Sequence, residues 1–351
     1  MKYGYRLEGA GDFVIENYDS AKAFSSFFPG IAGLHGIPLW AFYVNRGQCI
    51  SSFGTKDKDG AILEFLPANQ AYNLTAVRGF RTFIKVKNGK RHIFYEPFKE
   101  SADKLSRDIT TMMIISPAKL EIEEVNIALG LKINVSYITV PGEPFAALAR
   151  KLSITNIGGA KREIELIDGL PAVIPFGMTE WHAKHMSRTI EAWMHVLNAD
   201  KNVPFYKLKV NPQDRPELEY IEGGNFYLAY RAPEGKKRAK LLKTIIDPDI
   251  VFGRDGDISY PRIFAEEVHF NIPNKQKSEG KTPSAFCHAR LSIPAGGDKK
   301  IVSVIGHVKN LKALNALAPE VTTSLYFPEK VSENKEIIDR LVNTVFTKSS
   351  S

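Results

Sequence analysis

Residues 151–175 read KLSITNIGGAKREIELIDGLPAVIP, a stretch typical of an antiparallel β-sheet. Residues 152–156 and 163–167 contain Ile and Thr, which are β-branched and favour strands. Gly158-Gly159 lies between them and can form a turn, and a proline-bounded exit follows. The stretch therefore predicts two strands that pair with each other across a glycine turn.

The same pattern extends in both directions along the chain. Short segments rich in Val, Ile, Tyr, Phe and Thr alternate with Gly, Pro, Asn and Asp. Strand pairs are predicted at 39–44 with 49–53 and at 81–86 with 92–95, and further strands at 132–140 and 284–291. These segments predict a mainly β protein, a large antiparallel β-supersandwich that occupies residues 1–330.

Two segments have helical spacing instead. Residues 178–197 carry apolar residues on one helical face, which predicts a single amphipathic helix inserted into the sheet domain. Residues 332–346 begin with Ser332, a good N-cap residue, and carry a second apolar stripe. The stripe consists of Ile337, Ile338, Leu341, Val342, Val345 and Phe346. This helix is predicted to begin a C-terminal helical linker over residues 331–351.

Composition argues against several classes of protein. The 351 residues are 44% hydrophobic and 25% charged, as in ordinary globular domains. No run approaches the roughly 20 apolar residues that span a bilayer, and the start MKYGYRLEGAGDF lacks the apolar core of a signal peptide. Cys49 and Cys287 are far apart, so no disulfide framework is expected. We therefore expect a cytoplasmic protein with no membrane partner.

The formal net charge of +8 is scattered along the chain except for one cluster. Lys236, Lys237, Arg238, Lys240 and Lys243 follow the turn-forming sequence PEG at 233–235. We interpret this cluster as a solvated turn and strand edge, because the remaining basic residues are dispersed. No nucleic-acid partner is expected.

Motifs that would indicate catalysis or metal binding are incomplete. His182 and His185 are three residues apart, whereas zincin sites place two histidines four apart with a glutamate between them. Cys287 and His288 are adjacent in a predicted strand, so their side chains point to opposite faces. The residues alone therefore assign no catalytic group, no metal site and no cofactor.

One stretch combines residue types that bind sugars. Residues 36–48 read GIPLWAFYVNRGQ. Aromatic rings stack on the apolar face of a pyranose, and Asn, Arg and Gln hydrogen-bond its hydroxyls. The candidate substrate-binding residues are Trp40, Tyr43, Asn45, Arg46 and Gln48. The alternative interpretation is that Trp40, Phe42 and Tyr43 belong to the core and that Arg46 closes the turn.

Several short segments together cover nearly the whole chain. In order they are 1–5 (MKYGY), 13–15 (FVI), 38–48 (PLWAFYVNRGQ), 62–69 (ILEFLPAN), 79–83 (GFRTF), 191–194 (EAWM), 224–227 (GNFY), 251–253 (VFG), 259–261 (SYP) and 305–307 (IGH). In this combination the chain resembles the N-terminal region of cellobiose phosphorylase and its relatives, a glycosyltransferase-36-type family of glycoside phosphorylases. The segments within 38–83 are most similar to the β-glucan oligosaccharide phosphorylase branch.

The resemblance implies a fold and an activity for a longer protein. It implies a β-supersandwich, a helical linker from near Ser332, and an α/α barrel that holds the catalytic groups and is absent from these 351 residues. The full-length enzyme would phosphorolyse β-linked gluco-oligosaccharides to α-glucose 1-phosphate, with inorganic phosphate as co-substrate and no other cofactor. We expect this chain alone to be inactive and to contribute carbohydrate binding and dimerisation.

The partners implied by the resemblance are a β-linked gluco-oligosaccharide, the α/α barrel of the same full-length chain, and a second copy in a homodimer. Two alternatives stay open. The chain could be a stand-alone carbohydrate-binding or scaffold protein, because the fold alone suffices for that role. It could also be the sandwich domain of a related glycoside hydrolase.

Overall fold

The computed structural model describes residues 3–9, 11–28, 38–99, 108–212, 219–232, 238–254 and 256–344. Val345 and Phe346 of the predicted apolar stripe lie outside these ranges, as do Lys236 and Lys237 of the basic cluster.

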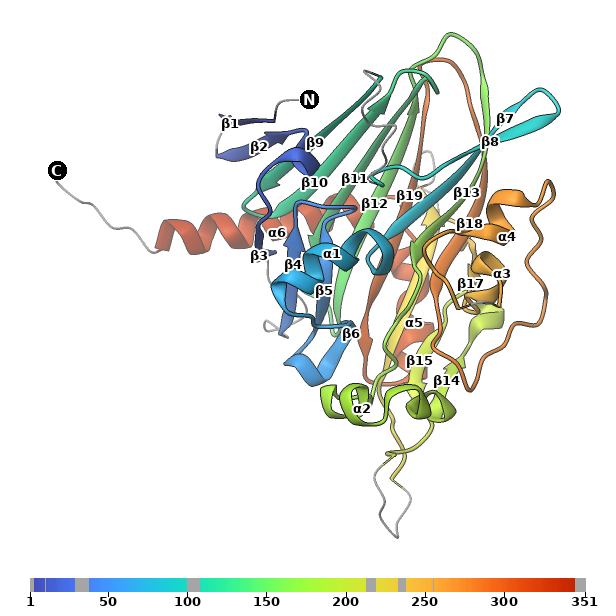
Figure 1. Ribbon diagram of the computed structural model, residues 1–351. Coiled ribbons are helices and arrows are strands. Elements are labelled where there is room, and N and C mark those ends of the chain that lie inside the picture. Colours follow the sequence, from blue (N-terminus) through green and yellow to red (C-terminus); the bar gives the residue numbers. More distant parts are fainter. Residues whose placement is uncertain are drawn as a thin grey trace.

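Nineteen strands in the described part of the chain form three antiparallel sheets (Figure 1). The largest has ten strands in the order β1-β2-β9-β10-β11-β12-β19-β16-β15-β14; a five-stranded sheet has the order β17-β18-β13-β7-β8, and a four-stranded sheet the order β3-β4-β5-β6. The ten-stranded sheet consists of β1 (Gly4–Glu8), β2 (Asp12–Glu16), β9 (Ile109–Ser116), β10 (Lys119–Asn126), β11 (Leu131–Thr139), β12 (Ala146–Asn156), β14 (Met194–Leu197), β15 (Phe205–Leu208), β16 (Gly224–Arg231) and β19 (Asp298–Val308). The smaller sheets consist of β7 (Arg81–Asn88), β8 (Arg91–Tyr95), β13 (Arg162–Leu170), β17 (Lys243–Ile245) and β18 (Ala285–Ile293), and of β3 (Ser25–Phe27), β4 (Leu39–Val44), β5 (Ile50–Thr55) and β6 (Ala61–Leu63). The prediction of a mainly β sandwich is confirmed.

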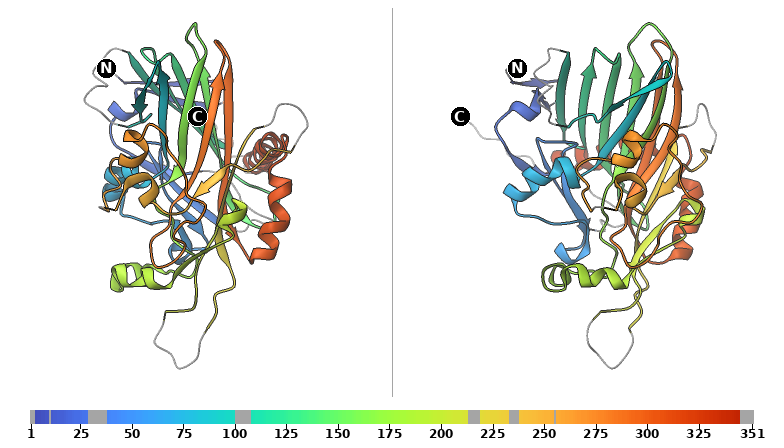
Figure 2. Two further views of the ribbon diagram at one scale, coloured as in Figure 1. Left: turned by 90° about the vertical axis from the view of Figure 1, so that its right-hand side faces the viewer. Right: turned by 45° about the vertical axis from the view of Figure 1, so that its right-hand side comes forward.

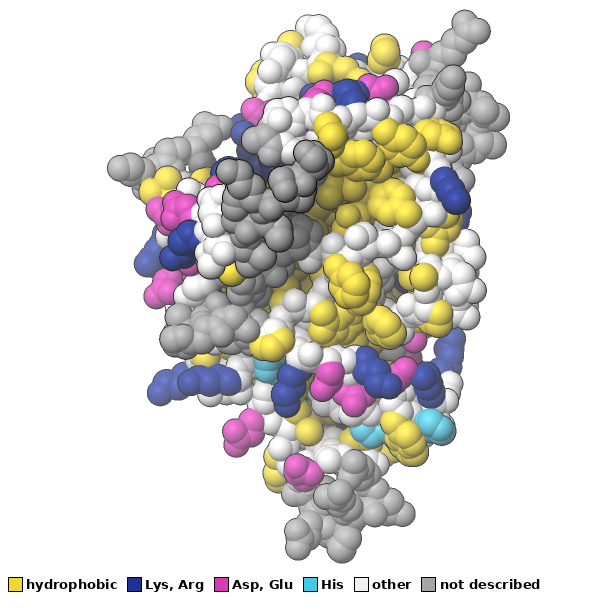
Figure 3. Space-filling view, turned by 90° about the vertical axis from the view of Figure 1, so that its left-hand side faces the viewer, with side chains coloured by type: hydrophobic (Ala, Val, Ile, Leu, Met, Phe, Trp, Pro, Cys, Tyr) yellow, Lys and Arg dark blue, Asp and Glu magenta, His cyan; other side chains and the backbone are white. Residues whose placement is uncertain are grey.

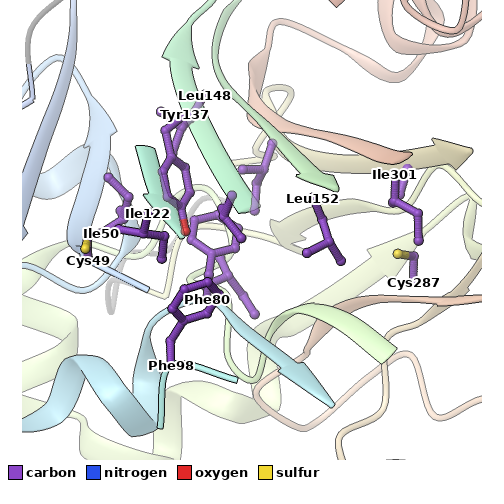
Figure 4. Close-up of a cluster of buried hydrophobic side chains, with 14 of the residues drawn as sticks. Cys49, Ile50, Phe80, Phe98, Ile122, Tyr137, Leu148, Leu152, Cys287 and Ile301 are labelled. Carbon is purple, nitrogen blue, oxygen red and sulfur yellow. The ribbon is translucent and has the colours of Figure 1, made fainter. Parts of the chain in front are cut away.

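The main hydrophobic core lies between the ten-stranded sheet and the two smaller sheets. Tyr137 and Leu152 come from the large sheet, Ile50 comes from the four-stranded sheet, Phe80 directly precedes β7, and Cys287 comes from β18 (Figure 4). Successive residues of a strand point to opposite faces, so β12 sends Leu148 and Leu152 into this core while Ala147 and Ala149 face the other way. Both cysteines are buried with free thiols.

Helices cover the outer faces of the sandwich (Figure 2). On the ten-stranded sheet, α5 (Leu311–Val321) and α6 (Tyr326–Thr344) pack against the outward residues of β12, β16 and β19. On the five-stranded sheet, α3 (Asp249–Phe252) and α4 (Arg262–Glu266) pack against Phe83, Ile167 and Phe286. The central strands are therefore buried on both faces, which accounts for continuous apolar runs such as FAALA at 145–149.

The strands of the stretch 151–175 exist, but they do not pair with each other. β12 pairs with β11 and β19, whereas β13 pairs with β7 and β18. The glycine segment between β12 and β13 carries the chain from one sheet to the other instead of closing a hairpin. That part of the prediction is wrong, because a turn sequence marks a change of direction and does not determine the neighbouring strand.

The predicted single helix over 178–197 is also only partly present. A short helix α2 (Glu180–His185) is followed by a 3-10 segment, Ser187–Trp193, and then by strand β14. Met194 and Val196 are buried while His195 and Leu197 are partly exposed, which is the two-residue period of a strand. The apolar residues at the end of the predicted helix therefore belong to β14, which is an edge strand of the ten-stranded sheet.

The C-terminal helix α6 begins at Tyr326, six residues before the predicted N-cap, so Ser332 lies inside it. Tyr326 and Phe327 are buried against the sheet, whereas Leu341 is 49% exposed and Val342 63% exposed. The first half of α6 thus makes the packing contacts, and the described part of the predicted stripe makes few of them. No helix in the described ranges combines the length and the apolar composition needed to cross a membrane.

Candidate functional site

Four aromatic side chains gather on the outer face of the four-stranded sheet. We call Phe27, Trp40, Phe42 and Phe65 the aromatic platform. The ring centroids of Phe27 and Phe42 are 4.4 Å apart, and Phe65 lies 5.8 Å from Trp40 and 5.6 Å from Phe42. Figure 3 shows hydrophobic side chains gathered in the middle of the face that carries β3 to β6. Phe27 is 69% exposed and Phe65 41% exposed, so the platform is open to a ligand.

The platform follows from the alternation of β4. Ala41 and Tyr43 face the core, so Trp40 and Phe42 must face outward. The indole Nε1 of Trp40 donates a hydrogen bond to the Asp57 carbonyl oxygen at 2.9 Å. That bond fixes the orientation of the indole ring while one face of the side chain remains partly exposed.

Three of the five predicted site residues are buried and already have internal partners. Tyr43 is 4% exposed and belongs to the main core. Asn45 is fully buried; its Nδ2 donates to the Tyr18 carbonyl oxygen at 2.9 Å and its Oδ1 accepts from the backbone N–H of Phe24 at 2.9 Å. Asn45 therefore holds the preceding loop against the β4–β5 turn, and neither side chain reaches solvent.

Gln48 is the third buried residue, at 2% exposure. Its Nε2 donates to Thr82 Oγ1 at 2.9 Å, its Oε1 accepts from Arg150, and its carbonyl oxygen accepts from the Tyr137 hydroxyl at 2.8 Å. This side chain links the four-stranded sheet to a buried ion pair in the core, so its role here is structural.

Arg46 and Trp40 lie in different places. Arg46 lies over the ring of Tyr72, 5.3 Å from its centroid, and its Nη1 donates to Asn73 Oδ1 at 3.4 Å. Both partners lie on α1 (Ala68–Arg78), so Arg46 closes the turn onto that helix. Trp40 lies near the start of β4, whereas Arg46 lies in the turn beyond its end at Val44. The structure therefore brings Trp40 together with three other aromatic residues but not with Arg46.

A cleft of about 320 Å³, lined by both apolar and polar side chains, adjoins the platform and shares Phe65 with it. The cleft lies between the segment around β6 and the start of α2, and its polar lining includes Lys58, Glu64, Gln70, Thr179, Glu180 and Lys184. A groove that begins with aromatic faces and continues with amide, hydroxyl and charged groups suits a ring that has both apolar faces and hydroxyl edges.

The charged groups of the cleft are held in ion pairs. Glu180 forms ion pairs with Lys58 and, at 2.6 Å, with Lys184, while Glu64 pairs with Arg78 at 3.1 Å. Hydrogen bonds from Lys184 and Lys58 lower the pKa of the Glu180 carboxyl below its usual value. Glu180 is therefore ionised at neutral pH and can accept hydrogen bonds, but it is not a proton donor for glycoside cleavage.

His182 serves to begin α2. Its backbone N–H donates to Thr179 Oγ1 at 3.3 Å, and its Nδ1 accepts from the Thr179 backbone N–H at 3.1 Å, which forms a capping box. The Glu180 backbone N–H also donates to Asp59 Oδ1 at 2.8 Å, which ties α2 to the β5–β6 connection. Across the described residues, no three His, Cys, Asp or Glu side chains lie close enough to hold a metal ion.

Phe27, Phe65 and the cleft residues were not among the sequence candidates. Phe65 lies in the segment ILEFLPAN, which contributes to the family resemblance. That resemblance does not indicate that the Phe65 side chain is exposed. Nothing in the local pattern distinguishes an exposed phenylalanine from a buried one. The platform depends on strands far apart in the chain, so only the fold could reveal it.

No protein-family model matches the chain, and no curated protein matches it. Among solved structures, a polysaccharide lyase matches 80% of the chain with 10% sequence identity and a TM-score of 0.43. A chain described as a kojibiose phosphorylase from the human microbiome matches 96% of it with 8% identity and a TM-score of 0.38. A family 36 α-galactosidase from Geobacillus stearothermophilus matches 88% of it with 10% identity and a TM-score of 0.34. This chain spans 34% of the length of each of the first two and 41% of the third.

Proposed function

We propose that this chain is a carbohydrate-binding sandwich domain of a carbohydrate-active enzyme and that the aromatic platform, with the adjoining cleft, holds the sugar. The observation that carries the proposal is the cluster of four partly exposed aromatic rings next to a cleft with both apolar and polar lining residues. Exposed aromatic rings in contact are costly in water unless a ligand or a partner covers them. A pyranose chain offers flat apolar faces for the rings and hydroxyl groups for the cleft.

The finer part of the proposal concerns the enzyme. We infer a glycoside phosphorylase that acts on β-linked gluco-oligosaccharides, on the basis of the ordered segments between residues 1 and 307. In that enzyme the phosphorolytic chemistry belongs to an α/α barrel joined to this domain, and the assembled enzyme is a cytoplasmic homodimer. The described carboxylates of its cleft are held in ion pairs and do not serve as proton donors. The role proposed for this domain is therefore binding and not catalysis.

Titration of the chain with cellopentaose, followed by calorimetry, tests the proposal. We expect saturable binding that Phe65→Ala weakens about three- to tenfold, because a stacked aromatic contact contributes about 0.5–1.5 kcal/mol. Tyr220→Ala is the matched control, because Tyr220 is 71% exposed and lies outside the platform. Binding that does not saturate, or that both variants weaken equally, would show that the platform does not bind the sugar.

The second candidate function is docking of another protein domain on the same platform. The high exposure of Phe27, at 69%, favours it, because a protein surface covers such a side chain as well as a sugar does. The two functions separate in one experiment. Docking predicts that Phe27→Asp abolishes association with the separately expressed barrel domain while cellopentaose affinity stays unchanged.

A further inference from the structure

A second and larger cleft, of about 730 Å³, opens where the ten-stranded sheet meets the edge of the five-stranded sheet. Its walls are the end of β16, residues 238–242, part of β18 and the start of β19. None of its described lining residues belongs to the aromatic platform or to the cleft that adjoins it. We call it the basic cleft.

The lining of the basic cleft is cationic. Arg231, Arg238, Lys240, Arg290 and Lys299 line it together with His288, and no carboxylate is among its described lining residues. These basic side chains come from β16, β18, β19 and the segment before β17. Cations that converge from separate elements on one cleft concentrate positive potential there.

Two of these residues contact a carboxylate of the protein itself. Glu165 on β13 pairs with Arg290 at 2.8 Å and lies 3.0 Å from the Nε2 of His288. The same carboxylate also pairs with Lys85 at 2.8 Å. One carboxylate of β13 therefore contacts two cations and a histidine.

Three of the remaining cations have no such carboxylate partner among the described residues. Arg231, Arg238 and Lys240 are exposed, and none of the three has an ion-pair partner within the described ranges. Like charges brought together in one cleft repel, so the arrangement costs free energy that a bound anion would recover.

The backbone holds two of these unbalanced cations in place. The Ala239 backbone N–H donates to the Thr322 carbonyl oxygen at 2.9 Å, and the Leu242 N–H donates to the Ala229 carbonyl oxygen at 2.8 Å. Isolated bridges join Arg238 to Thr323 and Leu241 to Tyr230. Arg238 and Lys240 are thus carried on a segment fixed at both ends, which lowers the entropy cost of binding a ligand.

The floor of the basic cleft is apolar. Leu241 and Leu242 are partly buried, and Ala289 and Leu291 are buried, so the cations surround an aliphatic base. A volume of this size matches a small-molecule ligand. An ion without a carbon framework would leave the aliphatic base uncovered.

We propose that the basic cleft binds a small organic phosphate that carries two or more phosphate groups on a compact carbon framework. Arg231 and Arg238 supply planar guanidinium groups, which bind phosphate oxygens through two parallel hydrogen bonds. Lys240 adds a third positive charge, and the leucine floor contacts the carbon framework. The site is distinct from the sugar site proposed above and does not depend on it.

Calorimetric titration with fructose 1,6-bisphosphate at low ionic strength tests this proposal. We expect saturable binding at one site, weakened about tenfold or more in the double variant Arg231→Ala/Arg238→Ala, because hydrogen bonds to charged groups are the stronger ones. Fructose, which has no phosphate, should not bind. Pyrophosphate, which has the charge but no carbon framework, should bind more weakly.

The matched control is Lys90→Ala/Arg91→Ala, which removes the same charge from exposed positions on the β7–β8 hairpin. It should bind fructose 1,6-bisphosphate as the unaltered chain does, and circular dichroism should show both double variants folded. Equal weakening in the two double variants, or no saturation at millimolar ligand, would overturn the proposal. Preferential binding of an oligonucleotide, lost equally in both variants, would overturn it as well.

Phe65→Ala separates this site from the proposed sugar site. It should leave the affinity for fructose 1,6-bisphosphate unchanged, and Arg231→Ala/Arg238→Ala should leave cellopentaose binding unchanged. Loss of phosphate binding in Phe65→Ala would contradict the assignment to the basic cleft.

Discussion

At the scale of single residues, the most consequential contact is a charge pair in the middle of the main core. Arg150 is 1% exposed and Asp168 is fully buried, and the two form an ion pair between the ten-stranded and five-stranded sheets. Thr82 donates to Asp168 Oδ1 at 2.6 Å, and Gln48 donates to Thr82. A buried charge without its partner costs free energy of folding. The ion pair therefore favours the packing of the two sheets that brings Arg150 and Asp168 together.

Asp168→Asn should lower the free energy of unfolding by about 3–5 kcal/mol, because it leaves the Arg150 guanidinium buried without a counter-charge. Asp298→Asn is the control, since Asp298 pairs with Lys300 at 3.0 Å on the surface and should cost less than about 1 kcal/mol. Urea unfolding measures both. Similar losses in the two variants would show that the buried pair has no special role.

His307 predicts a pH dependence of stability. Its ring contacts that of Phe176 in a tilted arrangement, with the centroids 4.3 Å apart, and burial lowers the pKa of the imidazole from 6.5 to about 4. Between these values the unfolded chain binds a proton that the folded chain does not, so stability falls as the pH is lowered from about 6.5 to 4. The loss attributable to His307 is about 2–3 kcal/mol.

His307→Phe should therefore make the unfolding midpoint less dependent on pH in that range, as measured by urea denaturation at several pH values. His269→Phe replaces an exposed histidine and should leave the dependence as it was. A His307→Phe chain that loses stability as steeply as the original would contradict this interpretation.

At the scale of elements, the sequence predicted several strands but not their neighbours. The 39–44 and 49–53 pair was correct, because the turn NRGQ has Gly47 at a φ of 56°, a value that glycine adopts without strain. The pairing of the strands in 151–175 was wrong, since β11 and β19 occupy both edges of β12, and β7 and β18 occupy both edges of β13. The platform was missed for the same reason: its members meet only after β3, β4 and the segment after β6 have come together.

The site residues show the same limit. Composition correctly indicated that 36–48 combines aromatic and amide side chains, but exposure decides which of them can meet a ligand. Alternation along β4 separates Trp40 from Tyr43, and the loop that Asn45 holds removes that residue from the surface. A local pattern gives residue types, whereas the face on which each lies depends on distant strands.

The attachment of α6 gives a prediction at this scale. Asn334 is fully buried, and its Nδ2 donates to the Thr139 carbonyl oxygen at 2.9 Å and to Thr139 Oγ1 at 3.1 Å. Asn334→Ala should destabilise the docked helix by about 1–3 kcal/mol, because it removes a donor from buried acceptors. Hydrogen exchange should then be faster along α6 while the exchange of β10 and β11 amides changes little.

Arg340→Ala, at an exposed position of the same helix, should leave α6 exchange as it was. Unchanged protection of α6 in Asn334→Ala would show that Tyr326 and Phe327 alone hold the helix on the sheet.

At the scale of the whole molecule, the layers explain where ligands can bind. Helices cover the outer faces over the central strands of the two larger sheets, so those faces offer little open surface (Figure 2). The two candidate sites lie where that cover ends. The aromatic platform lies on the outer face of the four-stranded sheet, and the basic cleft lies at the seam between the other two.

The order of strands in the ten-stranded sheet has a consequence for how the chain emerges from the ribosome. β12 borders β19, so Ala146 pairs with His307, more than one hundred and fifty residues later in the chain. Until β19 has been synthesised, the growing chain presents β12 as an edge with unpaired backbone groups and an apolar surface. Synthesis at roughly 5–20 residues per second leaves that edge open for about 7 to 30 seconds, during which it can pair with other nascent chains.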